Sequence, residues 1–217
     1  MFQLGNYGLA LSHSFETGAT SAFLHGWSLL TQTNHVTGAP MLSHTERIQE
    51  LIKSSVSLWA HPLLIPLILL EEHKYRVESF VQQELSPKTT SLESRLGVTY
   101  SGRLAGGMPF GPADLRQLMG NEEDRISLTS LLNTTMTDSI NLLGVLKWDL
   151  RYCQFLCRVQ DQLQQFHPDA LTSLGREIKE SIEASECAIT STSEFVDAMK
   201  QRLDLQLAVV CSLNTLP

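Results

Sequence analysis

The stretch that decides the fold is residues 169–213, DALTSLGREIKESIEASECAITSTSEFVDAMKQRLDLQLAVVCSL. Apolar and small residues recur in it at spacings of three and four, the period of one face of an α-helix. The other positions are largely polar or charged, which predicts one long helix with a narrow apolar stripe. We expect a partner helix on this stripe, either the preceding helix of the same chain, a second copy, or both. The stripe comprises Leu174, Ile178, Ile182, Ile189, Val196, Met199, Leu203 and Leu207.

A second long helix is expected at about residues 126–166, upstream of the first. His167 and Pro168 separate the two, because the residue before a proline is pushed out of the α region. Residues 112–217 are therefore expected to form a long antiparallel helical hairpin whose last helix is a coiled-coil-like stalk. The apolar positions expected to face its partner are Leu128, Leu131, Leu132, Ile140, Leu142, Leu143, Leu146, Leu150, Phe155, Leu156, Val159 and Leu163.

The N-terminal part, residues 1–111, is expected to combine a small β-hairpin with shorter helices. Residues 1–34 contain two loosely alternating segments separated by ETGAT, where Gly18 suits a turn. The whole chain is thus predicted to be mainly α, that is, α+β with one small N-terminal hairpin.

Two helices are expected between this hairpin and the long helical region. The first covers about residues 46–59, with Ser43 or Thr45 as the N-cap. The second covers about residues 63–85 and is expected to end at Ser86-Pro87.

Composition excludes several classes of protein. The chain of 217 residues carries a formal net charge of −7, which argues against binding to nucleic acid. The N-terminus lacks the features of a secretory signal, so an intracellular protein is expected. The most apolar run, Leu58 to Leu70, is shorter than the roughly 20 residues of a membrane-spanning helix and contains Pro62 and Pro66. It is expected to lie in the core.

The candidate metal ligands do not form a recognisable site. Cys153, Cys157, Cys187 and Cys211 lack Cys-x-x-Cys spacing, so we expect reduced, buried thiols. Metal-binding residues therefore remain unknown from the sequence.

Two acidic groups are expected to have structural roles. Glu71, Glu72 and His73 are adjacent on one helix and diverge by about 100° each, so they cannot converge on one ion and are expected to be solvated. The acidic residues 122–124 suit the N-terminal end of a helix dipole.

No catalytic or cofactor-binding residue is predicted. The glycine-rich stretch 102–111 matches neither the P-loop nor the dinucleotide fingerprint and is expected to be a connector. No nucleophile-elbow or His-Glu-x-x-His motif is present. His61, beside Pro62 and Trp59, is expected to be a hydrogen-bonded core histidine rather than a catalyst.

Three segments carry a resemblance to a known family: HPLLIPLILLEEH at 61–73, SLESRLGV at 91–98 and RLDLQLAVVCSL at 202–213. Their order resembles the soluble, cytoplasmic part of fungal CorA-like magnesium or divalent-cation transporters. In that family a stalk helix continues into two membrane spans and a Gly-Met-Asn-type signature. Here the stripe is followed only by residues 214–217. The resemblance therefore implies a domain truncated before the pore and unable to transport alone.

The function expected from this resemblance is non-enzymatic. The chain would form a homo-oligomer or join related transporter subunits through its C-terminal helix. It would lie in the cytoplasm and associate with a membrane through those subunits. Magnesium is implied by the resemblance alone. The alternative is a free-standing helical scaffold or adaptor that binds a partner helix. An enzyme with a pocket around residues 102–111 is a weaker third hypothesis.

Overall fold

A computed structural model describes the backbone of residues 2–4, 7–26, 43–96 and 122–214. The predicted domain boundary between residues 111 and 112 and the glycine-rich stretch 102–111 lie outside the described residues. The chain divides into two compact units. The sheet unit comprises Met1–Val77 and Val145–Thr192, and the helical unit comprises Glu78–Gly144 and Ser193–Pro217.

The sheet unit contains the predicted β-hairpin. Strands β2 (Tyr7–Ser14) and β3 (Ala19–Gly26) pair antiparallel, with Leu9 opposite Leu24. Gly18 in the turn has a φ of 65°, a conformation that glycine adopts without steric cost. A short strand that the sequence did not predict, β1 (Phe2–Leu4), pairs with the other side of β2. The described strands thus form a sheet in the order β1-β2-β3.

The first predicted helix is shorter than expected. Helix α1 runs from His44 to Ser54, and the 3₁₀ turn η1 covers Val56–Leu58. Ser43 is the N-cap, in a capping box with Glu46 that satisfies backbone N–H groups at both positions. The 3₁₀ turn ends at Leu58, and His61 lies outside any helix, as the following proline predicts.

The second predicted helix does not end at Ser86-Pro87, so that prediction is wrong. Helix α2 (Leu64–Phe80) leads into a π-helical turn, η2 (Val81–Leu85), and then into α3 (Ser86–Arg95). Pro87 stands in the first turn of α3, where a missing N–H costs little. The π turn changes the hydrogen-bond spacing just before the proline, which allows the chain to stay helical through it.

The two long helices are present and somewhat longer than predicted. Helix α6 spans Glu122–Phe166 and α7 spans Pro168–Asn214, with only His167 between them. Along α6 the buried positions alternate in steps of four and three, from Leu128 to Gln160, apart from one additional buried residue, Tyr152. Along α7 the same alternation runs from Gly175 to Val210, with one position of the series, Thr192, only partly buried. The mainly α fold with a small N-terminal sheet is therefore confirmed.

Several core positions on these helices are polar, which apolar patterning did not reveal. Ile140, predicted to face the core, is 51% exposed, while the neighbouring Ser139 is fully buried. Leu207 is only partly buried, and Gln206 beside it is 2% exposed. The helical step of three or four residues decides which side chains point into the core. A polar side chain at such a position is therefore buried. The other buried polar residues of this kind are Thr135, Asp149 and Gln160.

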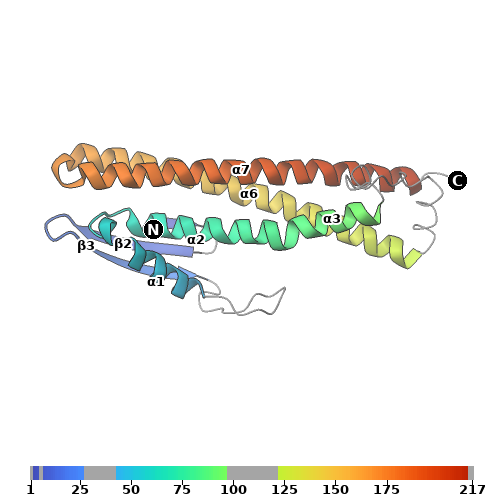
Figure 1. Ribbon diagram of the computed structural model, residues 1–217, viewed down its shortest axis with the longest axis horizontal. Helices are drawn as coiled ribbons and strands as arrows, with labels where there is room; N and C mark the ends of the chain where they lie inside the picture. Colours follow the sequence, from blue (N-terminus) through green and yellow to red (C-terminus); the bar gives the residue numbers. More distant parts are fainter. Residues whose placement is uncertain (1, 5–6, 27–42, 97–121, 215–217) are drawn as a thin grey trace. The chain divides into compact units, whose positions relative to one another are not determined.

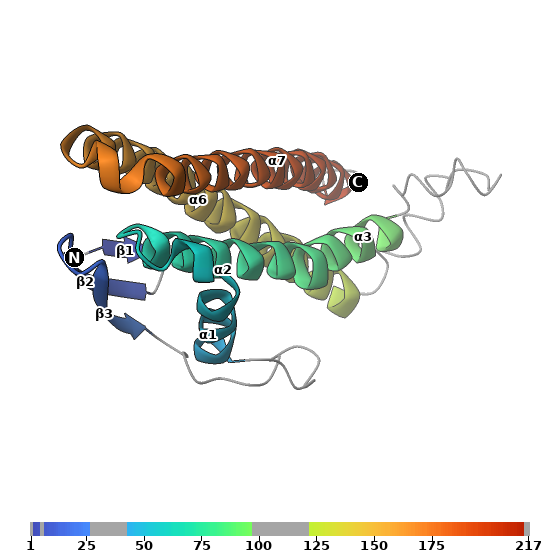
Figure 2. The same ribbon diagram turned by 60° about the vertical axis from the view of Figure 1, so that its left-hand side comes forward.

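Figures 1 and 2 show the layers of the sheet unit. Its part of α2 lies between the sheet on one side and the paired helices α6 and α7 on the other. The apolar run from Leu58 to Leu70 supplies much of this layer, with Leu70 fully buried. Residues 61–64 and 66–70 are buried, which confirms the core prediction for them, whereas Trp59 is 52% exposed and lies outside the core.

The helical unit has its own apolar cluster. It joins α3 to the first part of α6 and the last part of α7, through Leu92, Leu96, Leu128, Leu132, Leu203 and Val210. At its side, the Arg202 guanidinium binds both carboxylate oxygens of Glu93, with Nε 2.6 Å from Oε1. Such a two-point pair fixes the rotation of α7 against α3.

Candidate functional site

The predicted partner-helix stripe of α7 lies inside the chain's own core. Ile178, Ile182, Val196 and Leu203 are fully buried, and Ile189 and Met199 are 1% exposed. Leu174 and Leu207 are partly buried. A second chain therefore has to bind other faces of α7 unless this core opens.

The acidic residues of α2 are not a solvated helix face, so that prediction is wrong. Glu72 is 1% exposed, and its carboxylate lies 2.7 Å from both His44 Nδ1 and Arg47 Nε on α1. Glu71 accepts a hydrogen bond from the Ser185 hydroxyl of α7. These carboxylates are paired because α2 is enclosed by other elements, which a single-helix pattern does not show.

His73, the third residue of this group, points to another helix. Its Nε2 lies 3.3 Å from Oδ1 of Asp149 on α6, and Asp149 is 1% exposed. Neither carboxylate oxygen of Asp149 has a hydrogen-bond partner among the described residues. Glu71 thus contacts α7, Glu72 contacts α1 and His73 contacts α6. The three side chains diverge, as predicted. The apolar pattern does not include Asp149 because its side chain is charged, although its place in the three-four repeat is a core position.

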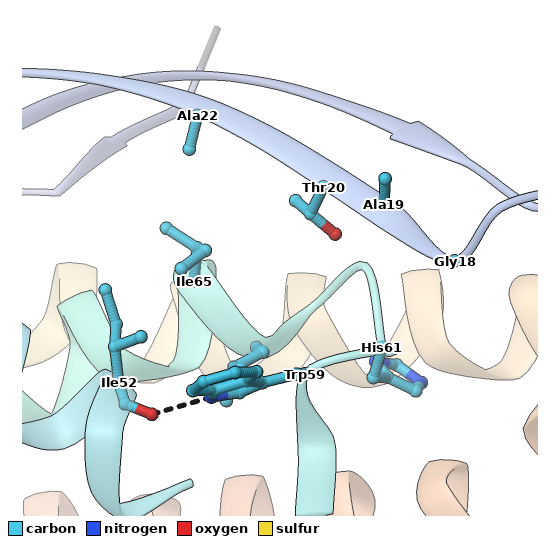
Figure 3. Close-up of a pocket in the computed structure, with 9 residues that line it drawn as sticks. Gly18, Ala19, Thr20, Ala22, Ile52, Trp59, His61 and Ile65 are labelled. Atoms are coloured by element: carbon cyan, nitrogen blue, oxygen red, sulfur yellow. Dashed lines mark hydrogen bonds between the residues drawn. The ribbon is translucent and has the colours of Figure 1, made fainter. Parts of the chain in front are cut away.

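A pocket of about 530 Å³ opens between β3 and the start of α2. Figure 3 shows Thr20 and Ala22 directed from the strand towards Ile65 and the Trp59 indole. The indole Nε1 donates to the Ile52 carbonyl at 2.8 Å, which holds the ring as one wall of the pocket. The walls are mostly apolar, so the pocket suits a small apolar group rather than an ion.

His61 lines the same pocket and has the environment expected of a core histidine. It is fully buried, and its Nδ1 accepts a hydrogen bond from the Leu63 N–H at 3.1 Å. Burial lowers the pKa of His61 to about 4, with the nearby Gln160 amide partly opposing this shift. Nε2 nevertheless lacks a partner with good hydrogen-bond geometry. The imidazole is therefore neutral at physiological pH.

The cysteines are free, but they are not all buried as predicted. Cys153 is buried, Cys157 is partly buried, and Cys187 and Cys211 are exposed. Burial raises the pKa of the Cys153 thiol to about 12, and Glu186 adds to this effect. Cys153 is thus a packing residue and a poor nucleophile.

The described residues do not bring together a set of magnesium ligands. No group of three or more His, Cys, Asp or Glu side chains in this part of the chain is placed to hold a metal ion. The acidic side chains of residues 122–124 and the stretch 102–111 lie outside what the structure describes. Among the described helices, none is both long and apolar enough to cross a membrane.

Comparisons with known proteins add no identification. No family model, curated protein or solved structure matches this chain. Arguments about function therefore rest on the residues themselves.

Proposed function

We propose that this chain is a non-enzymatic helical domain that works by assembling with copies of itself or with related subunits. The expectation comes from the resemblance to the cytoplasmic part of CorA-like divalent-cation transporters. In such a role the domain would lie in the cytoplasm and reach a membrane only through its partners.

The observation that supports this proposal best is the regularity of α6 and α7. Helices of 45 and 47 residues keep their buried positions in steps of three and four over most of their length. This repeat has the spacing of a coiled-coil seam, at which partner helices pack through the buried positions. The buried positions are used within the chain, so assembly requires the exposed faces.

The test is the mass of the purified chain in solution, measured by sedimentation equilibrium over a wide range of concentration, with and without added Mg²⁺. A fixed number of subunits that changes with Mg²⁺ would support the transporter-like role. A chain that stays monomeric under both conditions but captures an isolated amphipathic helix would instead favour the adaptor hypothesis.

A further inference from the structure

The outer face of α6 in the sheet unit is basic and aromatic, unlike the chain as a whole. Lys147, Arg151 and Arg158 are exposed and recur at helical spacing on one side. Trp148 and Phe166, 67% and 73% exposed, share this side. We call these five residues the basic face.

No carboxylate interrupts the basic face among the described residues of this segment. Asp149 is buried on the opposite side of the helix. Asp161 points towards α7, where Lys179 Nζ lies 3.0 Å from its Oδ1. Arg151 lies over the Trp148 ring, 5.2 Å from its centroid, so the guanidinium and the indole form one surface.

The outer face of α7 in the same unit is acidic. Glu177, Glu180 and Glu183 are exposed and follow one another at intervals of three residues. Arg176 Nε lies 4.0 Å from Oε1 of Glu180, and both side chains are more than two-thirds exposed, so this ion pair is weak. The exposed Ala184 is small and leaves room beside these carboxylates. We call Glu177, Glu180 and Glu183 the acidic face.

The two faces match in charge and in spacing. At a rise of about 1.5 Å per residue, Arg151 and Arg158 are about 10 Å apart and Glu177 and Glu183 about 9 Å apart. They belong to antiparallel helices of one unit and point outward, so they cannot neutralise each other within one chain. Trp, Phe and Arg are also the side chains most enriched at protein interfaces.

We propose that the basic face of α6 binds the acidic face of α7 on a second copy of this chain. Each copy then uses one face of each kind, so a head-to-tail contact repeats from copy to copy and gives a closed ring or an open filament. This inference rests on the proposed assembly function and names its interface. An anionic lipid surface is the competing partner for a basic and aromatic helix face. The lipid surface is disfavoured because its negative charge would repel the adjacent acidic face and a chain with a net charge of −7.

The test is a charge exchange followed by sedimentation velocity at low ionic strength. Arg151→Glu with Arg158→Glu, and separately Glu180→Lys with Glu183→Lys, should each weaken self-association by about tenfold, because each double change removes two exposed ion pairs and each pair contributes up to about a fivefold change. The four changes together should restore it. All four side chains are exposed, so circular dichroism should show unchanged folding.

Matched controls come from α1, where Lys53→Glu and Glu50→Lys change exposed charges off both faces and should leave association unaltered. Added salt should also weaken the wild-type assembly, since the screening length falls from about 10 Å at 0.1 M to about 3 Å at 1 M.

The remaining outcomes separate the two proposals. Wild-type assembly that is insensitive to the α6 and α7 changes would overturn this interface and leave the assembly function standing. A wild-type chain that is monomeric at every concentration, with or without Mg²⁺, would overturn both. Binding of that monomer to vesicles of anionic phospholipid, lost in the α6 variant, would assign the basic face to a membrane surface instead.

Discussion

Acid should destabilise this protein through one buried side chain, His61. The Nδ1 atom of His61 accepts the Leu63 N–H, and a protonated imidazole would place a second donor against it. Burial lowers the pKa of His61 from 6.5 to about 4. Below the ordinary pKa the unfolded chain therefore binds a proton that the folded chain does not. The contribution of neutral His61 to the free energy of unfolding is therefore fully present above about pH 6.5. It is lost as the pH falls towards 4.

The size of the effect follows from the shift. A difference of about 2.5 pKa units corresponds to about 3 kcal/mol when the loss is complete. Between about pH 7.5 and about pH 5 the free energy of unfolding should fall by about 2 kcal/mol from this residue alone. That amount is a considerable fraction of the stability of a typical domain.

The assay is urea unfolding at both pH values for the wild type and for His61→Asn. An asparagine oxygen can still accept the Leu63 N–H but does not titrate, so the variant should lose about 2 kcal/mol less than the wild type. His25→Asn, at an exposed position on β3, is the matched control and should behave as the wild type. An equal pH dependence for wild type and His61→Asn would refute the reasoning.

Two further predictions concern packing on α6 and α7. Ile182→Asp should lower the free energy of unfolding by about 4 kcal/mol or more, because it buries a charge in the chain's own core. Ala184→Asp on the exposed side of the same helix should change the thermal midpoint little, and equal losses would contradict the assignment of faces. In thiol labelling of the folded protein, Cys187 and Cys211 should react at once and Cys153 only after urea is added, since it is fully buried. Fast labelling of Cys153 without urea would show that the pair of long helices opens.

The candidate sites could be predicted only where the signal is local. His61 was identified from its place before Pro62 and beside Trp59, and it is a buried, hydrogen-bonded histidine. The pocket was missed because Thr20 and Ala22 meet Ile65 only after the sheet packs on α2. Sequence separation of more than 40 residues leaves no pattern that joins them.

The sequence by itself determined the hairpin and the two long helices of this protein, but not strand β1 or the helical path through Pro87. Gly18 marks the hairpin turn, His167 divides the two long helices, and the three-four spacing of α7 predicts each of its ends to within one residue. These features depend on backbone conformations and periods that a few neighbouring residues decide.

Only the tertiary structure decided which polar groups are buried and how they are paired. Glu72 became a core carboxylate because His44 and Arg47 of α1 fold against it. Ser139 and Asp149 lie in the core because the helix repeat, not their polarity, sets their direction. Burial is a property of the surroundings that other elements supply, so no local pattern contains it.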